Sequence, residues 1–486
     1  MIEPTIYELS QPGRIGVTFP EADVPRTSLP REFIRSDIAL PELSELDVIR
    51  HFTHLSKLNY SIDGGFYPLG SCTMKYNPKI NEEVARLPSF AHTHPLQPIA
   101  SVQGNLHLMY ELQERLKEIS GFHSISLTPA AGAQGELVGA LIIKKYHQEN
   151  QDPDRVKILI PDSAHGTNPA TSSMSGFKVV PLPSDVRGNV DLEALKSECD
   201  ETLAGLMLTN PNTLGLFDEH VETVIELVHE AGGLVYGDGA NLNALLGVLR
   251  PGDVGFDVMH FNLHKTFSTP HGGGGPGSGP VGVSENLAEF LPGPIVKIFV
   301  EGDEETLPFF GFYTPKYSIG RMKAFYGHFA MHIRAFTYIA MHGPQGMREI
   351  AERAVLNANY LMTRVKEDYV LPYDRTCMHE FVVEGAWKEK PGIHALDVSK
   401  RLMDYGFHPP TNYFPLIVHE ALMIEPTETE SKQTLDKFVS AMKGIAIEAA
   451  EDPELLQKAP HSTPIRRCDE VKAARDLVLC CWIPED

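Results

Sequence analysis

The dipeptide His264-Lys265 is the part of this chain whose residue types and position point most directly to chemistry. It ends an apolar run at 256–263 and precedes a glycine-rich segment at 270–279. The end of a buried strand is a costly place for an ammonium group, because desolvation favours the neutral amine. A neutral amine attacks aldehydes to form an imine, and pyridoxal phosphate is the aldehyde that proteins most often hold in this way. We therefore predict that Lys265 forms a covalent imine with pyridoxal 5′-phosphate.

The elements around this lysine form a regular pattern. Between about 120 and 285, short apolar runs alternate with helical segments, which is typical of βαβ units and a mostly parallel sheet. A long helical stretch after about 320 leads into a smaller α+β part. We predict an α/β enzyme with an N-terminal arm of short helices at 1–90, a large cofactor-binding domain at 91–340 and a small C-terminal domain at 341–486. The strand candidates are 156–160, 178–182, 206–208, 234–236, 258–261 and 379–383, and the helix candidates are 191–200, 220–231 and 431–449.

Polar residues follow the predicted strands, where ligands bind in open α/β sheets. Asp238 is predicted to pair with the pyridine nitrogen and keep it protonated, so that the ring acts as an electron sink. His165 and Ala240 are predicted to lie on the two faces of the ring. Thr209 or Asn210 is predicted to hydrogen-bond the ring hydroxyl.

The phosphate group needs a separate site, and the segment 128–136 supplies one. It is rich in small residues and leads into an apolar helix, so backbone N–H groups at the helix start can bind an anion. Taken singly, each of these residues is compatible with an ordinary loop, turn or helix cap. Their joint order along the chain favours a cofactor site. The candidate phosphate ligands are Gly132, Ala133, Gln134, Asn262 and His264.

Composition excludes several other classes of protein. The 42 basic and 64 acidic residues give a net charge of -22, which argues against nucleic acid and anionic membranes as partners. No uninterrupted apolar stretch is long enough to span a bilayer. The first residues lack the basic and apolar regions of a signal peptide. We therefore expect a cytoplasmic enzyme without a membrane or nucleic-acid partner.

Competing motifs are weak. The glycines at 277–282 have the spacing of a dinucleotide-binding fingerprint, but they lead into a strand-like run instead of a helix. His92 and His94, or His260 and His264, do not show a zinc-site spacing with further ligands nearby, so no metal is expected. Six scattered cysteines imply no disulfide framework.

Four motifs resemble the glycine decarboxylase P-protein family of the glycine cleavage system. They are the segments 70–77, 162–169, 209–215 and 264–277. The resemblance covers nearly the whole chain, which is similar to the C-terminal, catalytic half of the P-protein, the second (β) subunit of its split form. It implies the fold-type I architecture of pyridoxal-phosphate enzymes, with the cofactor on Lys265.

The resemblance also implies a reaction and partners. Glycine would lose CO2, and its aminomethyl group would pass to the lipoamide of H-protein, which makes the enzyme an oxidoreductase. P-protein subunit 1 (α) would complete an α2β2 heterotetramer. Two alternatives are another fold-type I aminotransferase or decarboxylase, and a non-catalytic partner subunit.

Three details stay open in the sequence. The segments 70–77 and 272–279 are candidates for gating the channel. The ligand of the substrate carboxylate is Arg321, Arg375 or one of several histidines. Cys72 is either redox-sensitive or a buried, inert thiol.

Overall fold

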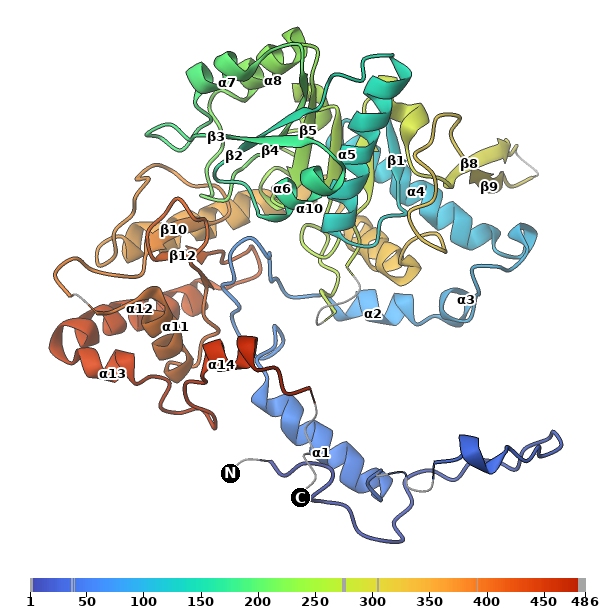
Figure 1. The fold of residues 1–486 in the computed structure, drawn as a ribbon, viewed down its shortest axis with the longest axis vertical. Helices are drawn as coiled ribbons and strands as arrows, with labels where there is room; N and C mark the ends of the chain where they lie inside the picture. The colour runs from blue at the N-terminus through green and yellow to red at the C-terminus, as the bar shows by residue number, and fades with distance from the viewer. Residues whose placement is uncertain are drawn as a thin grey trace. The chain divides into compact units, whose positions relative to one another are not determined.

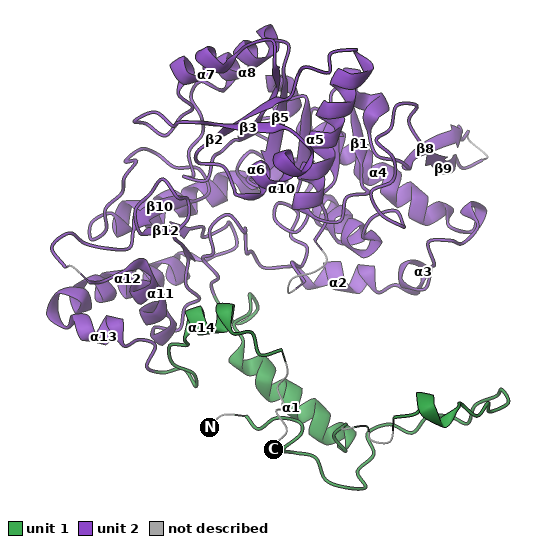
Figure 2. Cartoon of the chain, in the orientation of Figure 1, with its two compact units in different colours: residues 1–65, 462–486 green, residues 66–461 purple. Residues whose placement is uncertain are grey.

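The computed structural model describes residues 3–35, 38, 40–272, 277–303, 306–390 and 392–479. The chain divides into two compact units, one formed by residues 1–65 and 462–486 and the other by residues 66–461 (Figure 2). The predicted division at 90 and 340 stays a prediction. None of the described helices is both long and apolar enough to cross a membrane.

The larger unit contains a seven-stranded sheet made of β1 (Ser124–Ser126), β2 (Lys157–Pro161), β3 (Lys178–Leu182), β4 (Leu203–Thr209), β5 (Leu234–Gly239), β6 (Val258–Phe261) and β7 (Val281–Val283) (Figure 1). The strand order is β1-β7-β6-β5-β4-β2-β3. Strands β2 to β6 pair in parallel, whereas β7 pairs antiparallel with β6 and β1. The mostly parallel sheet predicted from the sequence is therefore confirmed, with one strand of opposite direction, β7, between β6 and the edge strand β1.

Helices cover both faces of this sheet, which explains why its strands are continuous apolar runs. Along β2, Leu159 packs into the core on the face that carries α4 (Gln103–Ser120) and α8 (Val221–Glu230). Its neighbours Ile158 and Ile160 pack on the opposite face, against α5 (Gly132–Glu149). The remaining helices of this part are α2 (Lys79–Ala85), α3 (Pro88–Ala91), α6 (Thr167–Met174), α7 (Leu192–Glu198), α9 (Pro251–Val254) and the 3-10 turns Ile99–Ser101, Leu242–Ala244 and Glu285–Phe290.

A second core lies in the C-terminal part of the same unit. The strands β10 (Phe381–Glu384), β11 (Thr411–Asn412) and β12 (Ala421–Ile424) form an antiparallel sheet in the order β10-β12-β11. The long helix α10 (Phe329–Val365) leads into it and is interrupted at Gly343, where φ is 61° and Pro344 follows. The other elements are α11 (Ala395–Asp404), α12 (Lys432–Glu451), α13 (Pro453–Gln457) and a separate hairpin of β8 (Ile295–Val300) and β9 (Phe309–Tyr313).

The smaller unit contains α1 (Glu45–Leu58), α14 (Glu470–Arg475) and the 3-10 turn Arg31–Phe33. Helix α1 begins with a capping box, in which Ser44 and Asp47 satisfy each other's backbone N–H groups. Leu46, Ile49 and Phe52 of this helix are exposed. Helix α1 therefore leaves apolar side chains uncovered.

Candidate active site

Three neighbouring strands bring polar side chains together at their carboxyl ends. In the register of the sheet, Thr209 of β4 is the partner of Asp238 of β5, and Asp238 is the partner of His260 of β6. All three residues are buried. Asp238 lies one residue before the end of β5, because the strand extends beyond the predicted 234–236. This edge of the sheet is the place where a ligand is expected in such a fold.

The Asp238 carboxylate is held by several donors. Asn168 Nδ2 donates to its Oδ2 at 3.3 Å, and the backbone N–H of Ala240 donates to its Oδ1 at 3.0 Å. His260 Nε2 lies 3.5 Å from the same Oδ1. These contacts fix the orientation of the carboxylate.

His260 is a residue whose role the sequence did not indicate. Its Nδ1 contacts the hydroxyl of Tyr236, and its Nε2 lies 3.1 Å from Asn262 Oδ1. Burial lowers the pKa of His260, so the ring is neutral and carries one N–H. Since Asn262 Oδ1 can only accept, the N–H is on Nε2, and Tyr236 donates to Nδ1. Tyr236, His260 and Asp238 thus form one buried polar chain.

Lys265 lies just after β6 in a tight turn, in which its backbone N–H donates to Asn262 O at 3.0 Å. Its Nζ makes no hydrogen bond or ion pair with a residue that the structure describes. Its positive charge is one of the influences that lower the pKa of the nearby Glu136 carboxyl, against the larger raising effect of burial. A lysine that is turned toward such a site without a permanent partner is free to bind an aldehyde.

The start of α5 forms a glycine-lined cradle beside β6. Among the described residues, no side chain caps this helix start. A Cβ atom at Gly132 would lie 2.4 Å from Asn262 Nδ2, and one at Gly279 would lie 2.1 Å from Ala131 O. Only glycine permits these approaches, and the exposed amides at the helix start suit a phosphate. Asn262 therefore lies beside the predicted phosphate loop.

The side chains of Gln134 and His264 both make hydrogen bonds to the backbone of loops near this helix start. Gln134 accepts a hydrogen bond from Ala130 N at 2.7 Å and donates to Met322 O at 3.1 Å, so its side chain closes the loop. His264 Nδ1 accepts from Ser278 N at 3.2 Å. Burial and the neighbouring His271 lower the pKa of His264 to about 3, so its ring is neutral. Neither side chain brings a positive charge to a phosphate, and the helix amides are the stronger candidates.

The residues present fit pyridoxal phosphate. Thr209 Oγ1 and Ser278 Oγ are buried without a hydrogen-bond partner among the described residues, and a bound polar group would satisfy them. Asp238 is placed for a protonated ring nitrogen, Lys265 for the aldehyde, and the start of α5 for the phosphate. The donor set therefore matches the three polar ends of the cofactor.

His165 and Glu136 are linked on one side of the site. His165 Nδ1 lies 2.8 Å from Thr167 Oγ1, which contacts Glu136 Oε1 at 2.9 Å. The His165 ring is exposed and contacts Phe414 edge-on at 5.6 Å. Burial, followed by the charge of Asp238, raises the pKa of Glu136 to about 8. Glu136 lies inside the segment 128–136, from which the phosphate site was predicted. The sequence of that segment does not show that the Glu136 side chain faces the site.

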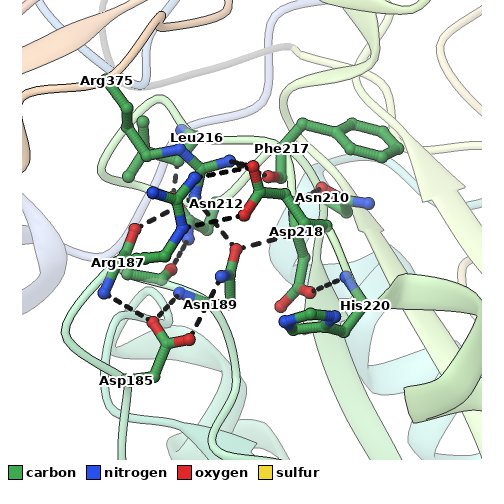
Figure 3. Close-up of polar contacts among 12 residues, drawn as sticks. Asp185, Arg187, Asn189, Asn210, Asn212, Leu216, Phe217, Asp218, His220 and Arg375 are labelled. Carbon is green, nitrogen blue, oxygen red and sulfur yellow. Dashed lines mark hydrogen bonds and ion pairs between the residues drawn. The ribbon is translucent and has the colours of Figure 1, made fainter.

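Asn210 and Arg375 belong to a separate network that shapes the loops after β4 (Figure 3). Asn210 Oδ1 accepts from Asp218 N at 3.0 Å. Arg375 donates to Arg187 O, to Asn189 Oδ1 and to Phe217 O, each at 3.0 Å. These contacts occupy the carbonyl of Asn210 and most of the Arg375 guanidinium. Thr209 is thus the better candidate for the ring hydroxyl, and Arg375 has little capacity left for a substrate carboxylate.

Lys75 is a buried lysine that the sequence did not single out. Its Nζ donates to Asn243 Oδ1 at 2.8 Å, to Thr266 O at 2.9 Å and to Glu428 Oε1 at 2.8 Å. Burial lowers its pKa, and the Glu428 carboxylate opposes that effect. These bonds tie the 70–77 segment to the turn that contains Lys265. The tip of the other proposed gating segment, 273–276, lies outside the described residues.

Comparisons with known proteins agree with this geometry. Residues 350–462 match a family model described as "Glycine dehydrogenase, C-terminal domain". A protein of Alkaliphilus oremlandii named "Probable glycine dehydrogenase (decarboxylating) subunit 2" is 56% identical over 479 residues, which cover 98% of this chain and 97% of that protein. A protein of the same name from Desulforamulus reducens is 56% identical and matches 100% of both chains.

Solved structures show the same fold. The glycine decarboxylase (P-protein) of the glycine cleavage system, in inhibitor-bound form, superposes with a TM-score of 0.73 at 22% identity over 86% of this chain and 93% of that one. A cysteine desulfurase from Thermococcus onnurineus NA1 gives a TM-score of 0.60 at 14% identity over 81% and 98%. The predicted fold-type I architecture of pyridoxal-phosphate enzymes is confirmed. With relatives this similar over its whole length, the chain belongs to the glycine dehydrogenase (decarboxylating) subunit 2 family.

Proposed function

We propose that this chain is the catalytic subunit of a pyridoxal-phosphate-dependent glycine dehydrogenase (decarboxylating) of the glycine cleavage system. It releases CO2 from glycine and transfers the aminomethyl group to the lipoamide of H-protein. The observation that carries this proposal is the placement, at adjacent strand ends, of a firmly held Asp238 and of Lys265, whose Nζ has no hydrogen-bond or ion-pair partner in the described part of the chain. A subunit that bound the cofactor only for stability would not need a lysine without a permanent partner.

The chain's residues divide the work of holding the cofactor. When bound, pyridoxal phosphate supplies an electron sink for the pair that the departing carboxylate leaves behind. Lys265 Nζ would hold it covalently, and the amides of Gly132 and Ala133 would bind its phosphate. Asn262 lies beside Gly132, His264 accepts from Ser278 N, and both are proposed to assist.

Asp238 is proposed to keep the ring nitrogen protonated. Asn168 and the N–H of Ala240 hold its carboxylate in one orientation, and His260 supports it from β6. Thr209 is proposed to donate to the ring hydroxyl, because its Oγ1 is buried and has no partner in the described part of the chain. His165 and Ala240 are proposed to lie on the two faces of the ring.

The partners of this chain are also part of the proposal. We infer that subunit 1 (α) of the P-protein completes an α2β2 assembly, since the relatives are named as second subunits. The exposed apolar side chains of α1, such as Leu46, Ile49 and Phe52, are suited to such a contact. The lipoylated H-protein is proposed as co-substrate. The cytoplasmic location expected from the sequence stays a prediction.

The direct test is CO2 release from carboxyl-labelled glycine. It should be measured for this chain alone, with its paired subunit, and with both the paired subunit and lipoylated H-protein. We expect rapid release only in the complete mixture. Comparable release from larger amino acids would indicate another fold-type I enzyme. Full activity of the paired subunit without this chain would show that the catalytic site lies elsewhere.

A further inference from the structure

Two glutamates and a histidine form a fully buried group that the cofactor site does not use. His379, Glu380 and Glu425 each have 0% of their surface exposed. One side-chain N or O atom from each lies within 4.8 Å of the others. His379 and Glu380 precede β10, and Glu425 follows β12, so two strands of the C-terminal sheet carry the group.

The 70–77 segment holds both carboxyls, and the Ser71 hydroxyl donates to Glu380 Oε1 at 3.3 Å. The backbone N–H of Ser71 donates to Glu380 Oε2 at 2.6 Å, and that of Thr73 donates to Glu425 Oε2 at 2.9 Å. Ser71 and Thr73 both adopt left-handed backbone angles, with φ of 59° and 49°. Such angles cost about 1–3 kcal/mol outside glycine and occur where function fixes the backbone.

The remaining polar atoms of the group are the two ring nitrogens of His379 and Oε1 of Glu425. His379 Nε2 lies 3.8 Å from Glu380 Oε1 and 3.9 Å from Glu425 Oε1. Both ring nitrogens of His379 and Oε1 of Glu425 lack a hydrogen-bond partner among the described residues. Buried polar atoms without partners are rare, and they point to a ligand or a proton that completes the site.

The pair is built to hold a proton. Two carboxyls this close in a buried site cannot both be ionised without a large cost. Burial raises the pKa of Glu380 well above its usual value, and burial raises that of Glu425 to about 7. Burial also lowers the pKa of His379 to about 3, so its ring stays neutral and cannot compensate their charge.

The other groups that face the pair are two lysines and a thiol. The positive charges of Lys265 and Lys75 lower the pKa of Glu425, against the larger effect of burial. Burial raises the pKa of the Cys72 thiol to about 11, so Cys72 is neutral. Lys75 Nζ also donates to Thr266 O, next to Lys265. The segment that holds the carboxyls is therefore bound to the turn that would hold the cofactor.

The proposed reaction requires one proton. Glycine, as the zwitterion, and a disulfide give CO2, an aminomethyl thioether with a protonated amine, and a free thiol. The two sides balance only when one proton is taken up. Glycine is oxidised as the disulfide is reduced by two electrons, so no further oxidant is needed. The proton must reach sulfur and not the reacting carbon, which calls for a positioned acid.

We propose that the Glu380–Glu425 pair is this acid, an inference that rests on the proposed function. The electron pair on the aminomethyl carbon forms a bond to one sulfur of the disulfide, and the S–S bond breaks. The second sulfur leaves with the bonding electrons and takes the proton that the two carboxyls share. The pair then regains a proton from water for the next cycle.

The decisive variant is Glu380→Gln/Glu425→Gln in the complete enzyme with its paired subunit and a lipoylated acceptor protein. Glutamine can still accept the N–H groups of the 70–77 segment, but it has no acidic proton. We expect the cofactor absorption to be unchanged and the rate of thiol formation to fall about 100-fold or more. The Glu425→Asp variant keeps a carboxyl group, so its rate of thiol formation should lie between those of the double variant and the unmodified enzyme. Glu448→Gln, which alters a carboxylate bonded to Arg401 outside the site, should leave the rate unchanged.

A second measurement does not depend on activity. In the chain without cofactor, infrared spectra at neutral pH should show protonated carboxyl groups. Part of that signal should disappear in the double variant and persist in Glu448→Gln. The remainder should persist in the double variant, because burial raises the pKa of Glu136 to about 8. The rate of thiol formation in the unmodified enzyme should fall as the pH rises through the titration of the pair, and the double variant should lack this decline.

Unchanged thiol formation in the double variant, or an unchanged infrared signal, would overturn the assignment. Failure of the unmodified enzyme to release CO2 from glycine would instead reject the proposed function. That failure is distinct, because the infrared signal of the pair does not require turnover.

Discussion

Two groups of buried carboxyls in the larger unit differ in how their oxygens are satisfied. Asp238 receives Asn168 Nδ2 and the N–H of Ala240, with His260 close by. Glu380 receives the backbone N–H and the hydroxyl of Ser71, and Glu425 receives the N–H of Thr73, while the Oε1 atoms of both converge near the neutral ring of His379. Asp238 is a single carboxylate with its own donors, whereas Glu380 and Glu425 form a close pair in which Glu425 Oε1 and both ring nitrogens of His379 lack a hydrogen-bond partner among the described residues.

This difference assigns different chemistry to the two groups. A single carboxylate that is held in one orientation suits a permanent partner such as a protonated ring nitrogen. Two buried carboxyls this close to each other lower their energy by sharing a proton, which they can deliver. The comparison therefore predicts that changes near Asp238 affect every step that needs the cofactor, whereas changes at the glutamate pair affect only proton-dependent properties.

Removal of the anchoring lysine should have the largest effect. With Lys265→Ala, we expect the visible imine absorption to be absent after addition of pyridoxal phosphate. Glycine decarboxylation should fall about 10⁴-fold or more, as is usual when a covalent catalytic group is lost. Lys144→Ala is a matched control, since this lysine donates to Ser175 O on the outer side of α5. A normal imine band in Lys265→Ala would contradict the assignment.

Neutralising the fixed carboxylate should have the next largest effect. With Asp238→Asn, the cofactor should still bind, because Lys265 and the start of α5 are intact. Decarboxylation should fall about 10²–10⁴-fold, because the ring nitrogen would lose the charge that keeps it protonated. The control Asp257→Asn alters a buried carboxylate that accepts from Val235 N at 2.7 Å, near the other end of β5. Near-normal turnover in Asp238→Asn would remove Asp238 from its proposed role.

The two groups also differ in how well they could be predicted from the sequence. The strands before Thr209, Asp238 and Lys265 are apolar runs, so the polar residue at each end stands out locally. These separate polar residues come together in one site, because parallel strands bring their carboxyl ends to the same edge of the sheet. The sequence could not show that the side-chain carbonyl of Asn210 accepts a hydrogen bond from Asp218 N, since that depends on the path of the loop.

The glutamate pair has no comparable local signal. Ser71 and Glu380 are 309 residues apart in the chain, and Thr73 and Glu425 are 352 residues apart. No periodicity links residues at such separations, and only the packing of the C-terminal sheet against the 70–77 segment brings them together. Strand β1 was not predicted, because a three-residue strand carries too little pattern to be recognised, whereas the run that forms β7 was interpreted as strand-like.

A smaller effect is expected on the pH dependence of stability. A carboxyl whose pKa rises from 4.5 in the unfolded chain to about 7 in the folded one binds more protons in the folded state between these values. The free energy of unfolding should therefore decrease as the pH rises from about 5 to 7. We expect this decrease to be at most about 3 kcal/mol from Glu425. Denaturant unfolding without cofactor should show a shallower decrease in Glu380→Gln/Glu425→Gln, and equal slopes would contradict the shared proton.

The smallest effect should come from the distant end of the Asp238 chain. With Tyr236→Phe, His260 Nδ1 loses its donor, which should lower the free energy of unfolding by about 1–2 kcal/mol. Turnover should fall by less than about tenfold, because Asn168 and Ala240 still hold the Asp238 carboxylate. Tyr369→Phe is a matched control, since its buried hydroxyl donates to Met442 O at 2.9 Å outside the site. If both variants lose similar stability but only Tyr236→Phe loses turnover, the chain through His260 supports catalysis and not merely folding. Equal turnover in the two would restrict the role of His260 to packing, and the donors on Asp238 would then be sufficient by themselves.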